Sequence, residues 1–418
     1  MSTGQAGPDA LVVGGGIGGL SAALALARKG ANVRVLERSA EFGEVGAGMQ
    51  IAPNCTRILR AYGLLEDAKR LGVRPENMVM KDAVDGTVLT SLDLKDMERR
   101  YGTPYIVIHR SDLHGMFLDA CREAGVSLRT SQHVIGYENV AACARVTLAD
   151  GTAHQAKLVV AADGMHSTAR ARLVGDALVN SAYVAYRGAV PIDKVRENGI
   201  SEKDVVVYVG PRCHFVQYPL RGGEMFNQVA VFESAKARAG EEDWGTPDEL
   251  DAAYKGMTGN IQRGLPLMWR DRWWRMFDRD PVMTWVYGRI ALLGDAAHPP
   301  LQYIAQGAIM AIEDGYVLAE HLAANPGDPD AALAAYQAVR TEHCRRVVET
   351  SRRWGALWHL DGEQRERRNE ILRARDTRDY SFVDWLYSGT ALTPAEEPPM
   401  FKVIPLVTGA CVTSSRSE

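Results

Sequence analysis

The chain has 418 residues, of which 46% are hydrophobic, so it is long enough to form two or three domains with a sizeable buried core. Its 48 basic and 52 acidic residues give a formal net charge of −4, which excludes the strongly basic surface typical of nucleic-acid-binding proteins. The six cysteines contain no CxxC pair and have no histidine cluster at metal-binding spacing, so we expect free thiols in a reducing compartment and no metal site. The cysteines are Cys55, Cys121, Cys143, Cys213, Cys344 and Cys411.

The sequence shows no targeting or membrane segment of the usual kinds. Residues 1–10 lack both the basic and the apolar region of a secretory signal peptide. The apolar run at residues 20–27 is far too short to span a bilayer. We therefore expect a cytoplasmic protein without a membrane partner.

The chain opens with the pattern of a βαβ unit. An apolar run at residues 10–13 predicts a buried strand, the Ala/Leu-rich segment 18–28 predicts a helix that ends at Gly30, and residues 31–37 predict a second strand. Two strands joined by a helix in this way form a parallel pair. Further along, Ser111 is predicted to cap a helix that runs through Glu123. Residues 157–162 and 289–293 predict two more buried strands, and a long helix is expected over 307–323.

The pattern changes between residues 183 and 233. Strand-like runs at 205–209, 213–219 and 227–232 alternate with turn residues such as those at 221–224, which predicts an antiparallel sheet inserted between two halves of a nucleotide-binding domain. The chain after residue 331 is predicted to be mostly helical, with a loop at 394–399. There Trp354, Leu357, Trp358 and Leu360 follow helical spacing, which is typical of a core or a dimer seam, so a homodimer is one expectation.

The segment 14–19, GGGIGG, satisfies the G-x-G-x-x-G pattern between a predicted strand and a predicted helix. In this pattern the first glycine forms the tight turn, the second lets the backbone approach a pyrophosphate, and the third lets the helix pack on the strand. Glu37 ends the second strand, where a carboxylate can bind ribose hydroxyl groups. The alternative is a glycine-rich turn with an ordinary surface glutamate. The predicted nucleotide-binding residues are Gly14, Gly16, Ile17, Gly18, Gly19, Glu37 and Arg38.

Two further strand-to-turn motifs favour FAD over NAD as the bound nucleotide. Residues 160–167 and 292–299 each form an apolar strand that ends in a tight turn with an aspartate, Asp163 and Asp295. An aspartate so placed can accept hydrogen bonds from a polyol chain, while the helix N-terminus that follows faces a phosphate or a flavin edge. A role for Asp163 as an ordinary cap or turn residue stays open.

In this order the motifs resemble those of the two-domain aromatic hydroxylases, the para-hydroxybenzoate and salicylate hydroxylase group of flavoprotein monooxygenases. The resemblance covers most of residues 10–325 and includes a DG motif (Asp163, Gly164, with Ser167 and Arg170) and a GD motif (Gly294, Asp295). It implies that Asp295 binds the ribityl chain of FAD, and that residues 45–50 form the glycine-rich segment near the flavin. The flavin-binding residues that it implies are Ala47, Gly48, Gln50, Arg110, Asp163, Asp295 and Gly307.

The resemblance also implies an α/β fold, with a Rossmann-like FAD-binding domain, an inserted antiparallel β-sheet substrate domain and a helical C-terminus. The predicted boundaries are 1–182 and 286–345 for the two parts of the FAD-binding domain, 183–285 for the substrate domain, and 346–418 for the C-terminal helical region and tail. One loop departs from the family pattern, because Gln302 stands at a usual proline, Ala305 at a glycine and Ile309 at an asparagine. An amide at position 302 suggests a donor and an acceptor that face the substrate.

The strand predicted at 213–219 is the candidate substrate site. Because side chains alternate along a strand, His214, Val216 and Tyr218 share one face, and a His and a Tyr so placed could hold a phenol. Without the family context, His214 is more readily explained as a buried core histidine whose hydrogen bonds are satisfied. In the family, however, this sheet covers the substrate cavity. The segments 221–233, 271–274 and 354–362 resemble one family member in particular, in which the matching His, Tyr and Gln line the substrate site.

The expected activity is therefore hydroxylation of a small phenolic acid, para to its hydroxyl group, with O₂ and a transiently bound NADH. The family acts through a flavin C4a-hydroperoxide. We expect His214 to take the substrate's proton, and Tyr218 and Gln302 to orient the ring. The sequence does not separate NADH from NADPH. The alternatives are a salicylate- or hydroxynicotinate-type hydroxylase, a flavin oxidase or dehydrogenase without oxygen insertion, and a non-catalytic FAD-binding module.

Overall fold

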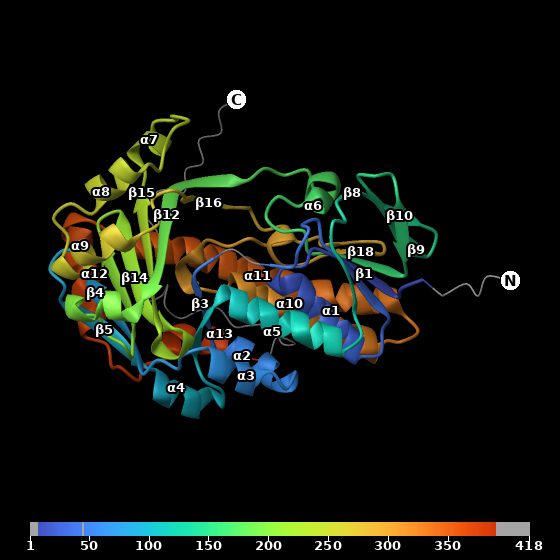
Figure 1. The fold of residues 1–418 in the computed structure, drawn as a ribbon, viewed down its shortest axis with the longest axis horizontal. Coiled ribbons are helices and arrows are strands. Elements are labelled where there is room, and N and C mark those ends of the chain that lie inside the picture. The colour runs from blue at the N-terminus through green and yellow to red at the C-terminus, as the bar shows by residue number, and fades with distance from the viewer. Residues whose placement is uncertain (1–6, 44–45, 390–418) are drawn as a thin grey trace.

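The computed structural model describes residues 7–43 and 46–389 and contains four sheets (Figure 1). The predicted βαβ unit is confirmed: β1 (Ala10–Val13) pairs in parallel with β2 (Val33–Leu36), and α1 (Ile17–Arg28) connects them. These strands lie in a six-stranded sheet of order β17-β18-β11-β1-β2-β7. Its other members are β7 (Ser127–Arg129), β11 (Leu158–Ala161), β17 (Val286–Tyr287) and β18 (Ile290–Leu292). All of its pairs are parallel except β17 with β18.

Helices cover one face of this sheet and the strands of residues 134–156 cover the other, so the sheet is buried on both faces. The strands β1, β11 and β18 are buried throughout, and such continuous apolar runs are typical of parallel strands that are covered on both faces. In Figure 1, α1, α5 (Arg110–Glu123) and α10 (Gly307–Ala324) lie side by side in the middle of the molecule. The predicted Ser111 cap of α5 is wrong, since His109 is the N-cap residue and its Nδ1 accepts a hydrogen bond from the Ser111 N–H at 3.3 Å.

The predicted antiparallel sheet is also confirmed and is larger than expected. It has seven strands in the order β16-β12-β15-β14-β13-β4-β5 and lies at the left of Figure 1. Four strands lie within the predicted insertion 183–285, and a fifth, β12 (Val179–Pro191), begins four residues before it. The four are β13 (Val205–Gly210), β14 (Cys213–Leu220), β15 (Met225–Glu233) and β16 (Trp274–Asp278). Two more, β4 (Asn77–Asp82) and β5 (Val88–Asp93), come from the first part of the chain, and β4 pairs in parallel with β13. The sheet therefore joins two segments that are distant in the sequence.

Two small sheets complete the strands. One contains β8 (Val134–Val140), β9 (Cys143–Leu148) and β10 (Ala153–Ala156), and the other pairs β3 (Gly48–Ile51) with β6 (Ile106–His109). The shorter helices are α2 (Pro53–Ala61), α3 (Leu65–Leu71), α4 (Leu94–Tyr101), α6 (Thr168–Leu173), α7 (Ala235–Arg238), α8 (Pro247–Ala253) and α9 (Gly259–Gly264). Six 3₁₀ turns complete the described elements: η1 (Ile192–Lys194), η2 (Arg196–Asn198), η3 (Arg221–Gly223), η4 (Leu265–Leu267), η5 (Gly294–Ala296) and η6 (Gln302–Ile304).

The C-terminal region is helical, as predicted. It contains α11 (Pro329–Trp358), α12 (Gly362–Arg373) and α13 (Ser381–Tyr387), and α11 packs against α10. The helix α12 is attached to the seven-stranded sheet by the buried carboxylate of Asp82, which accepts hydrogen bonds from Arg365 Nη2 at 2.7 Å and from Asn369 Nδ2 at 2.6 Å. Across residues 7–43 and 46–389, no helix is both long enough and apolar enough to cross a membrane. The predicted loop at 394–399 and Cys411 lie outside the described residues.

Candidate active site

The turn between β1 and α1 has the geometry that a pyrophosphate needs. Gly14 has a φ of +107°, and a Cβ there would lie 2.2 Å from the carbonyl oxygen of Ala162, so no other residue fits this turn. Gly16 is the N-cap residue of α1, and no side chain caps the N–H groups of the first turn. Such a helix N-terminus binds an anion through its N–H groups and its dipole. The glycine-rich turn therefore fits the diphosphate of FAD.

Glu37 is held beside this turn. Its two carboxylate oxygens accept hydrogen bonds from the backbone N–H groups of Gly15 at 2.7 Å and of Ser39 at 2.8 Å. The pairing fixes the carboxylate at the carboxyl end of β2, where a ribose hydroxyl could reach it. The neighbouring Arg38 is exposed. Neither Glu37 nor Arg38 forms part of the wall of the large cavity described next.

One cavity of about 680 Å³ extends from the glycine-rich turn to the seven-stranded sheet. It brings together predicted residues from five separate segments of the chain. The predicted residues that line it are Gly16, Ile17, Gly18, Gly19, Ala47, Gly48, Gln50, Arg110, His214, Tyr218, Asp295, Gln302 and Gly307. A cavity that is continuous from a phosphate-binding turn to a sheet of apolar and aromatic residues fits a dinucleotide with its reactive ring at the sheet.

The two aspartate motifs differ in their positions. Asp295 lines the cavity, as does Gly164, but Asp163 does not. The carboxylate of Asp163 instead accepts hydrogen bonds from Ser167 Oγ at 2.5 Å, from the Ala169 N–H at 3.2 Å and from Tyr137 Oη at 3.0 Å. These contacts are those of a turn and capping residue, the alternative that the sequence left open.

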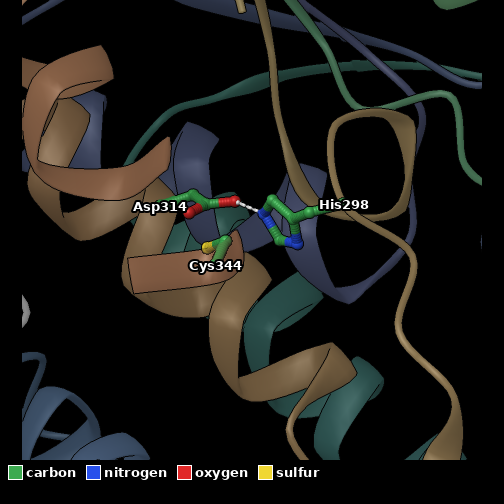
Figure 2. Close-up of side chains that lie close together, drawn as sticks. All are labelled: His298, Asp314 and Cys344. Atoms are coloured by element: carbon green, nitrogen blue, oxygen red, sulfur yellow. Dashed lines mark hydrogen bonds and ion pairs between the residues drawn. The ribbon is translucent and has the colours of Figure 1, made fainter. Parts of the chain in front are cut away.

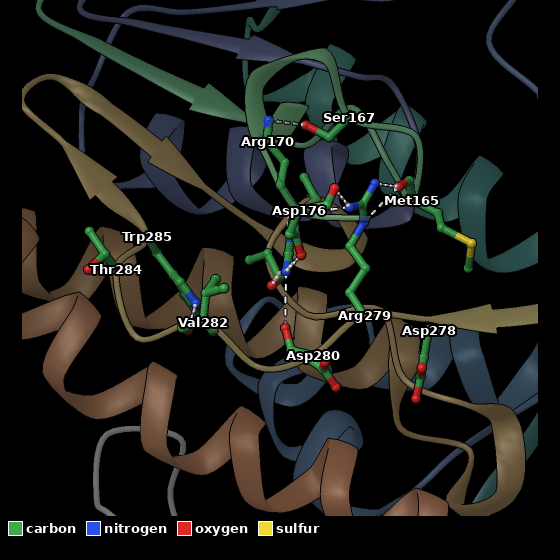
Figure 3. A network of polar contacts seen from close by, with 12 residues as sticks. Met165, Ser167, Arg170, Asp176, Asp278, Arg279, Asp280, Val282, Thr284 and Trp285 are labelled. Carbon is green, nitrogen blue, oxygen red and sulfur yellow. Dashed lines mark hydrogen bonds and ion pairs between the residues drawn. The ribbon is translucent and has the colours of Figure 1, made fainter. Parts of the chain in front are cut away.

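Arg170 of the DG motif is hydrogen-bonded to the loop that follows the GD motif, and Figure 3 shows its side chain beside Asp176 and Asp280. Its side chain is fully buried and forms a bidentate pair with Asp176, with N–O distances of 2.9 Å and 2.7 Å. The same guanidinium donates to the carbonyl oxygens of Asp280 at 3.1 Å and Ala296 at 3.3 Å, and also to that of Ala297. Bidentate pairing of this kind fixes orientation as well as adding energy. Arg170 therefore positions the loop that carries Asp295.

A second buried charge network supports the same loop from the other side (Figure 2). Asp314 on α10 accepts a hydrogen bond from the Gly294 N–H at 3.0 Å, and its Oδ2 lies 2.5 Å from His298 Nε2. Arg340 Nε donates to the same carboxylate at 2.7 Å. Cys344 lies close by, and ligand atoms of His298, Asp314 and Cys344 fall within 4.8 Å of one another. Sequence spacing did not indicate this cluster, because its members lie on three separate elements.

The charges in this network stabilise each other. Burial alone would raise the pKa of Asp314, but the cations of His298 and Arg340 lower it to about 2. Likewise, burial alone would lower the pKa of His298, and the Asp314 carboxylate raises it well above its ordinary value. A guanidinium already supplies the cation that this carboxylate needs. We therefore interpret the cluster as the support of the GD loop.

β3 connects the cofactor side of the cavity with the sheet. The Gly48 N–H donates to Asn227 Oδ1 on β15 at 2.9 Å, and a Cβ on Gly48 would lie 2.5 Å from the ring of Tyr218. Only glycine allows this close approach. Beside it, Gln50 Oε1 accepts a hydrogen bond from Tyr105 Oη at 2.6 Å.

The predicted alternation along β14 is confirmed. His214, Val216 and Tyr218 face the cavity, whereas Cys213 and Phe215 belong to the apolar cluster on the other face of the sheet. Trp354 and Trp358 of α11 also line the cavity. The helical spacing of this stripe alone indicates only a place in the core or in a dimer seam. The ring of Trp358 lies edge-on to His214, with centroids 5.1 Å apart.

His214 is buried and is paired with a second histidine that sequence reasoning missed. Its Nδ1 lies 2.9 Å from Nε2 of His359, the residue that follows α11. Burial lowers the pKa of His214 to about 3, and burial together with the nearby His214 lowers that of His359 well below its ordinary value. Both rings are therefore neutral near pH 7.

The loop with Gln302 lies opposite this sheet and brings in another unforeseen residue, Arg187. Arg187 on β12 lines the cavity, and its Nη2 donates to Gln302 Oε1 at 3.2 Å. Ala305 has a φ of +52°, a left-handed conformation that explains why the family pattern has glycine there. An arginine inside a strand gives no clear signal in a sequence, because most charged strand residues face solvent.

Comparison with known proteins agrees with this site. A family model described as an FAD binding domain matches residues 8–351. The 3-hydroxybenzoate 6-hydroxylase of Polaromonas naphthalenivorans (strain CJ2) is 39% identical, over 93% of this chain and 97% of that protein. The 3-hydroxybenzoate 6-hydroxylase 1 of Aquipseudomonas alcaligenes is 38% identical, over 90% of this chain and 96% of that protein. The 3-amino-4-hydroxybenzoate 2-monooxygenase of Streptomyces cremeus is 35% identical, over 92% of this chain and 95% of that protein.

Among solved structures, the chain resembles Klebsiella pneumoniae HpxO in complex with FAD and uric acid, with a TM-score of 0.77 and 26% identity over 88% of this chain and 92% of that one. These matches show the family: the chain belongs to the FAD-dependent aromatic hydroxylases. It is an FAD-dependent monooxygenase, and the relatives that it resembles over almost their full length include the 3-hydroxybenzoate 6-hydroxylases.

Proposed function

We propose that this enzyme hydroxylates 3-hydroxybenzoate para to its hydroxyl group, forming 2,5-dihydroxybenzoate with NADH and O₂. The observation that carries the proposal is the arrangement of His214 and Tyr218 on one face of the sheet, opposite Gln302, in the cavity that begins at the glycine-rich turn. The names of the relatives that are 37–39% identical support the choice of substrate.

When bound, FAD accepts electrons from NADH and activates O₂ for transfer of one oxygen atom to the ring. The side chains of the chain prepare the substrate. A phenolate ring is more electron-rich than a phenol ring, but a phenol with a pKa near 10 costs about 4 kcal/mol to ionise at pH 7. His214 Nδ1 is engaged by His359, so the other ring nitrogen, Nε2, is the one assigned to the substrate's hydroxyl group.

The low pKa of His214 changes how this proton is handled. A buried neutral imidazole does not hold a proton by itself, because burial disfavours the charged ring. A phenolate beside Nε2 would offset that cost through ion pairing. We therefore assign His214 to accept the proton as the ring is attacked, and not to store it beforehand.

Tyr218 keeps its proton and acts as a hydrogen-bond donor. Burial raises the pKa of its hydroxyl group, although the charge of Arg187 opposes the rise. Tyr218 and Gln302 orient the substrate so that the para carbon faces the flavin. Trp354, Trp358 and Tyr303 line the same cavity and keep water from the reaction.

The test is NADH consumption by the FAD-loaded enzyme with 3-hydroxybenzoate, with the product identified by chromatography. The proposal expects stimulated consumption and 2,5-dihydroxybenzoate as the product. Salicylate, hydroxynicotinate and 3-amino-4-hydroxybenzoate serve as competing substrates, and a preference for one of them would replace the proposed substrate. Consumption that yields only hydrogen peroxide from every phenol would favour an oxidase.

A further inference from the structure

We propose that Arg187, together with the amide nitrogen of Gln302, binds the carboxylate of the substrate and so selects aromatic acids over neutral phenols. This inference rests on the proposed function and extends it to a residue to which the sequence pattern assigns no role. It identifies the part of the cavity that recognises the acid, at the opposite end of the substrate from the hydroxyl group that His214 binds.

The register of the sheet places Arg187 within reach of the same substrate as His214. Arg187 on β12 pairs with Val229 on β15, which pairs in turn with Val216 on β14. Val216 lies between His214 and Tyr218 on the face that lines the cavity. Neighbouring strands lie about 4.8 Å apart, so Arg187 is two strands, or about 10 Å of backbone, from the histidine's strand. Two side chains that extend into the cavity can bridge this separation with one benzene ring between them.

The surroundings of Arg187 favour the binding of an anion beside its guanidinium. Among the described residues, no Asp or Glu forms an ion pair with Arg187. In contrast, thirty-odd other ion pairs join an arginine or lysine of these residues to a carboxylate. Its guanidinium lies over the ring of Trp274, 5.6 Å from the centroid, and the nearby charge of Arg110 adds a second cation to the cavity. A guanidinium stays charged, and a cation in a largely buried site is stable only with a partner.

The hydrogen bond to Gln302 determines which groups face a ligand. Because Arg187 Nη2 donates to Gln302 Oε1, the acceptor of that amide is engaged and its Nε2 remains as the group that can donate to a ligand. From the sequence, we expect Gln302 to offer the substrate both a donor and an acceptor. With the acceptor engaged, Arg187 and Gln302 both present N–H groups, and this set matches two carboxylate oxygens.

The other end of the cavity does not discriminate by charge in this way. His214 and His359 are neutral rings, and Tyr218 is a neutral phenol, so they bind a hydroxyl group through hydrogen bonds alone. Arg187 is therefore the group that distinguishes an aromatic acid from the corresponding amide as a ligand. A bidentate guanidinium also fixes the direction of the carboxylate, which helps to determine which ring carbon faces the flavin.

The experiment compares two ligands of nearly the same shape, 3-hydroxybenzoate and 3-hydroxybenzamide, in equilibrium binding to the oxidised FAD-loaded enzyme, followed by the change in flavin absorbance. The wild type should bind the acid more tightly than the amide. Arg187→Gln should weaken binding of the acid by about 30-fold or more and change binding of the amide by only a few-fold. Arg187→Lys keeps the positive charge but loses the paired N–H groups of the guanidinium. It should recover part of the preference for the acid over the amide.

Arg270→Gln is the matched control, because Arg270 forms an exposed pair with Asp251 in the same part of the chain. It should leave both affinities unchanged. FAD content and the melting temperature are measured for each variant. The inference is overturned if the wild type does not prefer the acid, if Arg187→Gln weakens both ligands equally, or if that variant mainly loses FAD. A variant that loses the acid preference while the wild type forms no 2,5-dihydroxybenzoate would support the carboxylate site and reject the proposed reaction.

Discussion

His214 Nδ1 and His359 Nε2 share one hydrogen bond of 2.9 Å inside the protein. Exactly one of the two nitrogens can carry the proton in a neutral pair. His359 Nδ1 has no hydrogen-bond partner among the described residues. In the pair that can react, His214 carries its proton on Nδ1 and donates it to His359 Nε2, because only then is His214 Nε2 free to accept the substrate's proton. Arrival of the substrate's proton at His214 Nε2 is then opposed by burial and favoured by the phenolate.

Removal of the second histidine should slow hydroxylation without affecting the cofactor. His359→Phe keeps a ring for stacking on Tyr183, 4.6 Å away between centroids, but leaves His214 Nδ1 unpaired. We expect the turnover rate to fall about 10- to 100-fold, with unchanged FAD content. His359→Gln restores a hydrogen-bonding group and should recover part of the rate, and the exposed His133→Gln should have no effect. Equal, wild-type rates for both His359 variants would contradict a role for the pair.

His214→Asn should reduce the rate of hydroxylation about 10²- to 10⁴-fold, the range for loss of a general base. Binding of FAD should persist, because the glycine-rich turn is formed by other segments of the chain. The measurement is product formation under single-turnover conditions, with FAD content as its control. A variant that retains more than a tenth of the wild-type rate would remove His214 from the proton step.

The buried histidines should make the protein less stable in acid. The folded-state pKa values of His214, about 3, and His359 lie below the ordinary value of 6.5. The unfolded chain therefore binds more protons than the folded chain below pH 6.5, and the free energy of unfolding falls as the pH drops from 6.5 toward 3. Each histidine contributes up to about 1.4 kcal/mol per pH unit in this window.

This linkage is measured by urea denaturation at about pH 7 and about pH 5. His214→Asn should show a smaller loss of stability between these two pH values than the wild type. Because the acidic groups of the chain are the same in both proteins, the difference isolates the histidine. An identical loss in both proteins would mean that the His214 pKa is not lowered by burial.

Gly48→Ala should displace Tyr218. The added Cβ would lie 2.5 Å from the Tyr218 ring and 3.0 Å from Asn227 Cγ, so either β3 or the ring must move. We expect a loss of about 1–3 kcal/mol in the free energy of unfolding and weaker substrate binding. The matched control is Gly115→Ala in α5, where no atom lies within 4 Å of the new Cβ and helix propensity favours alanine. Tolerance of alanine at both positions would contradict the close approach.

Asp314→Asn should destabilise the GD loop. The change leaves the buried His298 without its carboxylate and leaves Arg340 with the carboxylate of Glu313 alone, which costs about 3–5 kcal/mol. FAD affinity should fall as well, because the Gly294 N–H is hydrogen-bonded to Asp314. Asp330→Asn, which removes the exposed carboxylate that pairs with Arg289, should change stability by less than about 1 kcal/mol. Similar effects of the two substitutions would argue against the network as the support of the loop.

Local patterns predicted the parts of the fold that local chemistry determines. The βαβ unit follows from the glycine turn and its apolar flanks, and the cavity face of β14 follows from the alternation of His214 and Tyr218. The strands β4 and β5 were missed because most of their residues are half-buried and show no clear alternation. His359 and Arg187 were missed because each acquires its place through a partner more than a hundred residues away.

The most direct test of the account is the fate of oxygen when the enzyme turns over 3-hydroxybenzoate under ¹⁸O-labelled dioxygen with NADH. We predict that mass spectrometry will find 2,5-dihydroxybenzoate with one ¹⁸O atom, in the hydroxyl group para to the original one. A product labelled at another carbon would contradict the proposed orientation by His214, Tyr218 and Gln302. NADH oxidation without any labelled product would contradict the proposed substrate.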